Sequence, residues 1–562
     1  MHTASPAGAG PLQEWRLSTQ ALSLRWHQEK YAQAGEITPE DSRRRVAHAL
    51  AQVEPWRNRA AWAQRFERAM NQGLLPAGRI MAGAGTVDGA AAKRSLMNCF
   101  VLPTQPLHQL PHRLMRTLQA GGGVGMDFSS LPFGVMEQLD RCEQWAQSME
   151  QPPGGAPRRA AQMAVLSARH AAFPAFIAAD PSAHPHVARA VALDDDFMRS
   201  AQSEVSTESQ ALRAMAEAVW TSGEPSVLFV TRIQADDNLA DHETLLATNP
   251  CGEQPLPAFG ACALASLDLT RVIQRPFASE AHVAWGLLAA LVHVGVRLLD
   301  DALEWSPWPL PEQASEMRRH RRIGLGITGL GDALAMLNLH YASPAACDQA
   351  RLLMRFIAHS AYRASVRLSR ERGPYPAFCA SGVLRSPRFA SRLPADLRHD
   401  IRRYGLRHSH LLAIAPAASI SVAYADGVST GVEPMTAAQW RRTWQDPQGR
   451  RCSAWVHAHA WRLWQMLKGE QQQPTQGWAW LDRISPDAQL HMVAALAPHV
   501  DGGISKTVSM PPSTTAQEIE RLIRLAWRLQ LKGLALFRRG SRTGVITTGN
   551  DPAADASCGP CP

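Results

Sequence analysis

Short apolar runs alternate with helical patterns along the chain from residue 75 onward. The runs "NCFVLP", "AQMAVLS", "PSVLFV" and "LLAIAP" are bounded by glycine, proline or polar residues and have the length of buried strands. The segments "GDALAMLNL" and "ARLLMRFIAHSAYRASVRLSRERG" have helical periodicity, and we also assign "ETLLAT" to a helix. Strands that alternate with helices predict βα units, and therefore an α/β fold with a parallel sheet or barrel.

Both ends of the chain depart from this alternation. Residues 12–75 predict helices, because "EDSRRRVAHALAQVE" follows the turn-like "GEITP" and "RAAWAQRFERAMNQG" ends on the capping residue Gly73. The last stretch, "TGNDPAADASCGPCP", is small, polar and rich in proline, so we expect a mobile tail.

Composition narrows the class of protein. The 562 residues are 45% hydrophobic and 19% charged, as in a globular protein. The most apolar segment, "WGLLAALVHVGVRLLDDALEW", is interrupted by His293, Arg297 and two aspartates, so it predicts a buried helix rather than a membrane span. The beginning of the chain lacks a secretory pattern, so we expect a cytoplasmic protein with its nine cysteines reduced. A net charge of +9, with runs of arginine, suits a polyanionic ligand such as a nucleotide, although solvated helix faces explain such runs equally well.

Cys558 and Cys561 form a C-x-x-C pair in the tail. Two cysteines do not complete a zinc site, so we predict no metal bound by side chains. A dithiol on a flexible segment suits thiol–disulfide exchange, and the alternative is an incidental pair.

Three glycine-rich or small-residue segments could approach a ligand. "GLGITG" (Gly324, Gly326, Gly329) lacks the context of a dinucleotide fingerprint and is interpreted as the start of a helix. The turn in 413–434 offers backbone N–H groups and hydroxyls to a phosphate. "AGGGVGMDFSS" (120–130) allows close backbone approach to a ligand, or is a flexible loop.

"ATNPCGEQPLPAFGAC" (247–262) carries the most specific chemistry. Alternate residues of an extended loop point the same way, so Asn249, Cys251 and Glu253 are expected to converge on one small ligand. A carboxylate that takes a proton, an amide that orients and a thiol that reacts together suit chemistry at hydroxyl groups.

These residues closely resemble the active-site loop of ribonucleotide reductase large subunits, above all the adenosylcobalamin-dependent class. The resemblance extends almost from end to end, through "LPAGRIMAGAGT", "MNCFV", "GGGVGMDFSS", "RRAAQMAVL", "GEPSVLF", "RRIGLGITGL", "STGVEP", "DGGISKTV" and "LKGLALFRRGS". It implies a ten-stranded α/β barrel of two five-stranded parallel halves with a central finger loop. The domains would be a helical N-terminal region (1–75), the barrel (76–545) and a redox tail (546–562).

The resemblance also implies a role for each site residue. Cys251 would be the thiyl radical that takes the ribose 3′ hydrogen, Glu253 would accept the 3′-hydroxyl proton, and Asn249 would bind the substrate hydroxyls. Cys99 and Cys262 would be the reducing dithiol, re-reduced by Cys558 and Cys561. The expected substrate contacts are Asn249 and Glu253 together with Ala77, Asn98, Gly122, Gly123, Pro416, Ala417, Ala418, Ser419 and Ile420.

The radical generator follows by elimination within the family. The chain has six tyrosines, none adjacent, so the tyrosine pair that relays a radical from a separate diiron subunit is absent. "GVITTGNDP" is not a glycyl-radical motif. Adenosylcobalamin remains as the cofactor, with a thioredoxin- or glutaredoxin-like reductant as partner. We expect a monomer or homodimer that binds neither nucleic acid nor membrane and reduces ribonucleotides, with diphosphates as the expected form, for DNA synthesis.

Some positions depart from the family pattern. The phosphate turn has Ala417 and Ala418 where the family usually has Thr and Gly, and the loop after Ser130 is short by about a dozen residues. We therefore expect an active reductase with weakened or absent control by deoxynucleotide effectors. Two alternatives stay open: a catalytically silent paralogue that binds nucleotides or regulates a reductase, and another radical enzyme on the same barrel.

Overall fold

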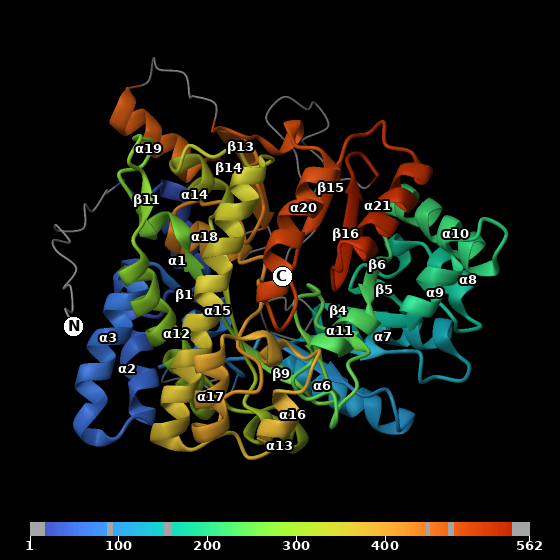
Figure 1. Ribbon diagram of the computed structural model, residues 1–562, viewed down its shortest axis with the longest axis horizontal. Helices are drawn as coiled ribbons and strands as arrows, with labels where there is room; N and C mark the ends of the chain where they lie inside the picture. Colours follow the sequence, from blue (N-terminus) through green and yellow to red (C-terminus); the bar gives the residue numbers. More distant parts are fainter. Residues whose placement is uncertain (1–16, 87–93, 151–159, 446–449, 470–476, 542–562) are drawn as a thin grey trace.

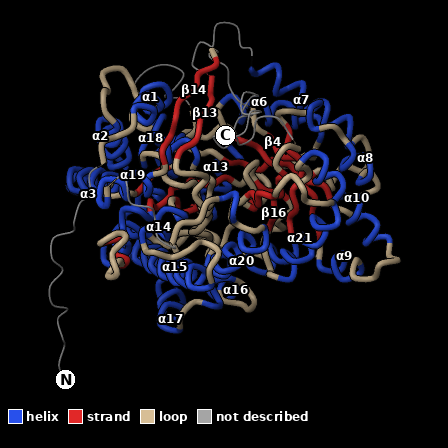
Figure 2. The backbone as a smooth tube through the Cα atoms, turned by 90° about the horizontal axis from the view of Figure 1, so that it is seen from above, coloured by secondary structure: helices blue, strands red, loops and turns tan. Residues whose placement is uncertain are grey.

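The computed structural model describes residues 17–86, 94–150, 160–445, 450–469 and 477–541. Its centre is a ten-stranded sheet, with helices around the strands on all sides (Figures 1 and 2). The strands of this sheet are β1 (Leu74–Pro76), β2 (Cys99–Leu102), β3 (Gly123–Asp127), β4 (Gln162–Ser167), β5 (Val187–Leu193), β6 (Ser226–Phe229), β9 (Ala261–Asp268), β12 (Ile323–Thr328), β15 (Thr507–Met510) and β16 (Gly533–Arg538).

Strand direction changes at three places in the sheet, one of which is the antiparallel pair of β1 and β9. The five strands β2 to β6 run parallel in that order, whereas β9 pairs with β2 and β16 pairs with β6 antiparallel. Next to β9 lies the parallel strand β12, and β15 lies parallel to β16. Isolated parallel bridges also join Leu325 to Leu412 and Ile414 to Ile504, just before β15. The predicted α/β class is confirmed, and the sheet is mixed rather than parallel.

Helices of about one to eight turns cover the outer face of the sheet. In chain order they are α1 (Ala21–Lys30), α2 (Pro39–Leu50), α3 (Arg59–Asn71), α4 (Gly78–Gly83), α6 (Leu110–Gln119), α7 (Val135–Glu150), α8 (Phe173–Ala178), α9 (Asp195–Ser200), α10 (Thr207–Ser222), α11 (Val230–Asp236), α12 (Trp285–Trp305), α13 (Pro311–His320), α14 (Leu330–Met336), α15 (Pro344–Arg372), α16 (Ala380–Val383), α17 (Ala395–Tyr404), α18 (Ala418–Ala425), α19 (His459–Lys468), α20 (Pro486–Leu496) and α21 (Ala516–Arg528), the shortest being α4, α8, α9, α11, α14 and α16. The helices predicted within 12–75 are present as α1–α3 on the left of Figure 1, where α2 and α3 lie beside α12 and α1 lies beside α18.

Side-chain alternation on the central strands explains their apolar sequences. On β4, Ala164 and Leu166 belong to the outer core beneath the helices, whereas Met163 and Val165 belong to a smaller inner cluster. Because both faces are buried, the strand has a nearly continuous apolar sequence, as the runs predicted. The inner cluster also contains Leu256, which comes from a hairpin on the inner side of the sheet.

Two segments differ from their predictions. "ETLLAT" is not a helix: residues 243–246 are a loop and Ala247–Thr248 form the short strand β7, because a short apolar run does not separate helix from strand. "LLAIAP" makes bridges at Leu412 and Ile414 without forming a longer strand. The apolar segment 285–305 is the buried helix α12, as predicted.

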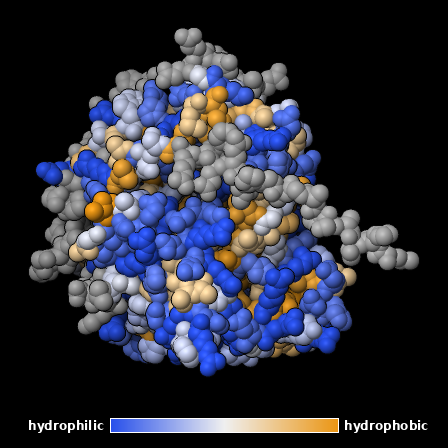
Figure 3. Space-filling view, turned by 90° about the vertical axis from the view of Figure 1, so that its left-hand side faces the viewer, coloured by the Kyte–Doolittle hydropathy of each residue, from blue (hydrophilic) through white to orange (hydrophobic). Residues whose placement is uncertain are grey.

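The surface of this fold is largely polar. The face that contains the left-hand helices of Figure 1 is predominantly hydrophilic, with apolar side chains in separate patches (Figure 3). Among the described residues, no helix has the length and apolar character needed to cross a bilayer.

Candidate active site

A β-hairpin carries Asn249, Cys251 and Glu253 to the inner side of the sheet. Its strands are β7 (Ala247–Thr248) and β8 (Pro255–Leu256). The turn is closed by Asn249 N, which donates to Gln254 O (3.1 Å), and by Gly252 N, which donates to Asn249 O (3.0 Å). Gly252 has φ +82°, a conformation that glycine adopts without a steric cost. The three side chains therefore converge because the turn is tight, rather than because the loop is extended as the sequence predicted.

Glycines on the surrounding strands let the hairpin backbone come close. A methyl group on Gly125 of β3 would lie 1.7 Å from the carbonyl oxygen of Thr248, and one on Gly123 would lie 3.1 Å from Pro250 Cγ. On the other side, Gly503 N donates to Glu253 O at 2.8 Å. The glycine-rich segment 120–130 is thus not a flexible loop. At Gly123 and Gly125 the hairpin of the same chain fills the space that a ligand would need.

This packing predicts the effect of Gly125→Ala. We expect the free energy of unfolding to fall by about 3 kcal/mol or more, since a β-carbon cannot share the position of a backbone carbonyl and overpacked sites cost about 1–3 kcal/mol even where side chains can move. Urea unfolding measures this change. The matched control is Gly286→Ala in α12, where a β-carbon meets nothing within 4 Å and stability should not fall. Equal stability of the two variants would contradict the close approach.

Asn249 connects the hairpin carboxylate to a thiol on the sheet. Its Nδ2 donates to Glu253 Oε1 (2.9 Å) and to Cys99 Sγ (3.1 Å), and Cys99 Sγ lies 4.0 Å from the same carboxylate oxygen. The amide is fixed from the other side, because Gln254 N donates to Asn249 Oδ1 at 2.9 Å. Carboxylate, amide and thiol therefore form one rigid cluster.

Burial makes these groups reluctant to ionise. Glu253 is 1% exposed, and loss of solvent raises its pKa to about 7 although Asn249 donates to it. Burial also raises the pKa of Cys99 and of Cys262 well above the ordinary value. The charges of Glu253, Cys251 and Cys262 add to the shift at Cys99, so the three cysteines and the carboxylate share one electrostatic environment. Cys99 and Cys262 are consequently neutral near pH 7.

Cys99 and Cys262 face each other across two strands. They are directly opposed in the antiparallel β2–β9 pair, and both are buried free thiols. Directly opposed residues have Cα atoms about 4.5–5.5 Å apart, which lies within the range that a disulfide spans. The register therefore allows these two thiols to close a disulfide with little movement of the backbone. Cys251 is less buried, at the hairpin tip.

Small residues surround the dithiol. Ala77, Leu264 and Ala413 pack with Cys99 and Cys262 in one buried cluster, and Ala415 lies against it. The structure thus places Ala77, which was expected to contact the substrate, beside the dithiol. Asn98 and Gly123 lie at the same edge, where Gly123 N donates to Asn98 O at 2.7 Å. A methyl group on Gly122 would meet the Phe100 ring.

Two buried polar atoms of this site have no partner within the described residues. They are Glu253 Oε2 and Asn98 Oδ1. A buried acceptor without a hydrogen bond costs free energy, so such atoms indicate a place where a ligand donates. A ligand with hydroxyl groups would satisfy both.

The predicted phosphate turn (416–421) is the start of α18. Ala417 is its N-cap residue and has φ +52°, an uncommon conformation for alanine. The first N–H groups of a helix lack acceptors within the helix. The backbone N–H groups of Ala418, Ser419 and Ile420 can therefore donate to a ligand at the start of α18. Ser419 also accepts a hydrogen bond from Tyr31 at 2.7 Å. No sequence pattern indicated Tyr31, which lies 388 residues away from Ser419 along the chain.

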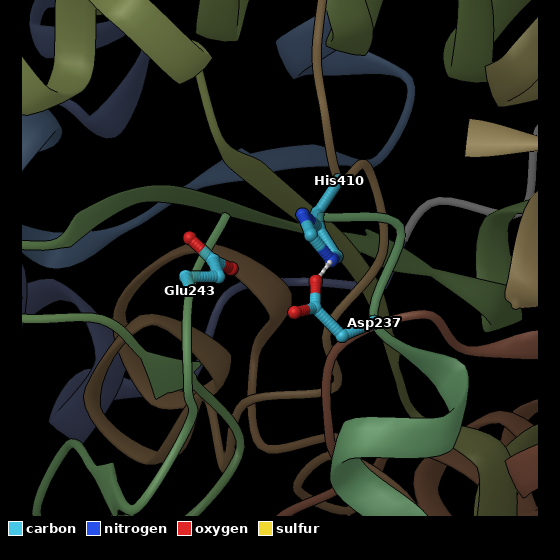
Figure 4. Close-up of side chains that lie close together, drawn as sticks. All are labelled: Asp237, Glu243 and His410. Carbon is cyan, nitrogen blue, oxygen red and sulfur yellow. Dashed lines mark ion pairs between the residues drawn. The ribbon is translucent and has the colours of Figure 1, made fainter. Parts of the chain in front are cut away.

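Another group of side chains has metal-ligand character. Asp237, Glu243 and His410 converge behind the hairpin, and His410 Nε2 lies 3.1 Å from Asp237 Oδ1 (Figure 4). The guanidinium of Arg322 already supplies the positive charge, because it pairs with Glu243 and donates from Nε to His410 Nδ1 at 3.1 Å. A metal ion would have to displace this buried arginine. Cys558 and Cys561 lie outside the described residues.

The chain is similar to known proteins over most of its length. The barrel domain of ribonucleotide reductase matches residues 202–537, and its all-alpha domain matches residues 17–89. A vitamin B12-dependent ribonucleoside-diphosphate reductase from Mycobacterium tuberculosis is 30% identical over 91% of this chain and 77% of its own length. A protein of the same name from Thermoplasma acidophilum is 24% identical, over 87% and 66%. The ribonucleoside-diphosphate reductase large subunit of Monkeypox virus is 30% identical over a shorter region, 41% of this chain and 31% of its own.

Proposed function

The chain belongs to the ribonucleotide reductase large-subunit family, and from this premise we propose that it reduces ribonucleoside diphosphates to 2′-deoxyribonucleotides with cobalamin as cofactor. The observation that carries the proposal is the single cluster of Cys99, Asn249 and Glu253, with Cys262 directly opposite Cys99. A dithiol beside a buried base and amide supplies the two electrons and the proton transfer that this reduction requires.

We propose that the sheet closes into the ten-stranded barrel of the family. The isolated parallel bridges Leu325–Leu412 and Ile414–Ile504 support closure, because they connect β12 to the segment that leads into β15. A closed barrel would surround the hairpin and keep water away from radical chemistry at its tip.

In the proposed mechanism Cys251, as a thiyl radical, removes the 3′ hydrogen atom of the ribose. Glu253 accepts the 3′-hydroxyl proton, and Asn249 holds the substrate hydroxyl in place. The 2′-hydroxyl leaves as water, while Cys99 and Cys262 give up two hydrogen atoms and become a disulfide. Cys251 then returns the hydrogen atom to C3′, which regenerates the thiyl radical, and Glu253 returns the proton to the 3′ oxygen. Each deoxynucleotide thus consumes one dithiol. Exchange with Cys558 and Cys561, and then with a thioredoxin-like protein, restores the pair.

The backbone at the hairpin tip is open on one side, next to Cys251. A β-carbon on Gly252 would meet nothing within 4 Å, and Cys251 is the most accessible of the three site thiols. We propose that cobalamin binds on this side in its adenosyl form, which supplies by homolysis the radical that oxidises the Cys251 thiol. The protein then contributes position and shielding.

The direct test is turnover. Purified protein is incubated with adenosylcobalamin, a dithiol and each ribonucleotide as diphosphate and as triphosphate, and deoxynucleotide is measured. We expect product from the diphosphates. No product from any substrate would contradict the proposal and favour a silent paralogue.

A single-turnover experiment tests the assignment of the thiols. Without added reductant, pre-reduced protein should form about two deoxynucleotides per chain, one from each dithiol, whereas the Cys558→Ser/Cys561→Ser double variant should form about one. Peptide mapping after denaturation should then find Cys99 linked to Cys262. A linkage that instead involves Cys142 or Cys347 would refute the assignment.

A further inference from the structure

Helix α1 is fixed along the whole length of α18. At the far end of α18, Ser23 Oγ donates to Asp426 Oδ1 (3.0 Å) and Gln20 N donates to the same oxygen (2.8 Å). At the near end, Tyr31, the residue that follows α1, donates its hydroxyl hydrogen to Ser419 Oγ (2.7 Å). The N-terminal helices are therefore attached to the element whose first turn is proposed to hold the substrate phosphates.

The Tyr31 hydroxyl lies where two helices begin. It is 3.1 Å from the position of a β-carbon on Gly78, the first residue of α4, and it is bonded to Ser419 in the first turn of α18. Ala77, which packs with the dithiol, directly precedes α4. The Tyr31 side chain thus lies between two sets of expected substrate contacts, Ala77 on one side and residues 416–420 on the other.

Positive charge surrounds this hydroxyl. The charges of Arg79 in α4 and Arg442 in β13 (Gln439–Gln445) both lower the pKa of Tyr31, although burial raises it overall to about 12. The Arg79 guanidinium also lies against Gly121, since a β-carbon there would be 2.3 Å from Arg79 Nη1. A tyrosine with this pKa keeps its hydroxyl hydrogen at neutral pH, so it can donate to Ser419 Oγ.

The direction of the hydrogen bond decides what Ser419 can do. Its oxygen accepts from Tyr31, so its own hydrogen is free to be donated, and it is the single hydroxyl side chain in 416–420. A hydroxyl that accepts one hydrogen bond becomes a stronger donor in the next. Tyr31 also restrains the Ser419 rotamer, because the ring is buried and packs on Tyr424 with centroids 5.2 Å apart.

We infer that Tyr31 is a positioning residue for the substrate phosphates, which acts by holding the Ser419 hydroxyl as a donor to a nucleoside diphosphate. This inference rests on the proposed function and deepens it. In it, the helical N-terminal region and the sheet domain both contribute residues to the phosphate site. Tyr31 supplies the pre-organisation and Arg79 the charge, while Ser419 and the first N–H groups of α18 make the contacts.

The test compares Tyr31→Phe, Ser419→Ala and the double variant in the full chain. We expect Tyr31→Phe to raise KM for CDP about tenfold, with kcat within about twofold, since hydrogen bonds to charged groups are worth about that factor. Because Tyr31 acts through Ser419, the double variant should bind no worse than Ser419→Ala alone. Tyr404→Phe in α17, which removes the same atom away from the site, is the control and should leave KM unchanged.

Binding measured without cobalamin separates this inference from the proposed function. Calorimetry with CDP and with inorganic pyrophosphate should show the same tenfold loss for Tyr31→Phe. If this loss occurs but the wild-type chain forms no deoxynucleotide, the proposed function fails and the phosphate assignment stands. The inference is overturned by unchanged affinity for both probes, by effects of the two substitutions that simply add, or by a lower Tm with unchanged affinity.

Discussion

Replacing Cys251 by alanine is expected to reduce deoxynucleotide formation by about four orders of magnitude or more, while CDP binding changes less than about twofold. The reason is that the proposed mechanism assigns removal of the 3′ hydrogen to Cys251 alone, whereas Cys99 and Cys262, held in the β2–β9 pair, are assigned the supply of electrons. The turn should survive, because its hydrogen bonds involve the backbone of Asn249 and Gly252 rather than the thiol.

Turnover and calorimetry on the same preparation check this expectation. The matched control is Cys379→Ala, since Cys379 is exposed and distant in sequence from the hairpin, and its loss should leave turnover unchanged. In the variant, Cys99 and Cys262 should also remain reduced after incubation with substrate and cofactor. Turnover above about 1% of wild type would exclude Cys251 as the hydrogen-abstracting group.

Glu253→Gln should separate activity from stability. As a base, Glu253 must be ionised, so wild-type kcat should rise with pH through about 7, where its pKa lies. Glutamine keeps an oxygen for the Asn249 hydrogen bond but cannot take a proton, and we expect kcat to fall by about 10²- to 10⁴-fold. The acid limb of the pH profile should disappear with it.

Stability should change in the opposite direction. The pKa of Glu253 is raised from 4.5 to about 7 in the folded chain, so between these values the folded state binds more protons than the unfolded state. This contribution to stability is complete below about pH 4.5 and is lost as pH rises through about 7. At pH 8 the glutamine variant should therefore be the more stable protein, by about 3 kcal/mol, and the difference should vanish near pH 4.5.

Urea unfolding at both pH values measures this difference. Glu217→Gln, on the exposed face of α10, is the control and should change neither kcat nor the pH dependence of stability. A glutamine variant that is less stable than wild type at pH 8 would contradict the buried, pKa-raised carboxylate.

Periodicity predicted part of the secondary structure, namely elements whose buried faces can be read from the local sequence. β2, β4 and β6 were expected from their apolar runs, and α12, α14 and α15 from their helical patterns. The segment 243–248 was misassigned because its conformation depends on packing inside the sheet, against residues such as Val101 and Met163 that are far away along the chain. Local propensity carries no information about such partners.

The sequence indicated which residues make up the candidate site, but not how they are arranged. The resemblance identified Asn249, Cys251, Glu253, Cys99 and Cys262, and the structure brings these residues together. The tight turn, by contrast, depends on the hydrogen bond between Asn249 and Gln254, and the opposition of the two cysteines depends on strand register. Tyr31 could not be predicted from the sequence, because only the packing of α1 on α18 brings it to Ser419.

The burial of Cys99 and Cys262 in the β2–β9 pair limits the size of the reductant that can reach them. Cys262 is 0% exposed and Cys99 6%, so the disulfide they would form presents almost no sulfur surface to solvent. A folded redox protein carries its thiols on a broad surface and cannot bring them into contact with such a bond, because exchange requires one sulfur to reach another directly. Electrons must therefore arrive on something as narrow as a single extended chain. A terminal segment that carries its own dithiol is narrow enough. The length of such a segment, rather than its sequence, would then limit how fast the disulfide of the enzyme can be reduced.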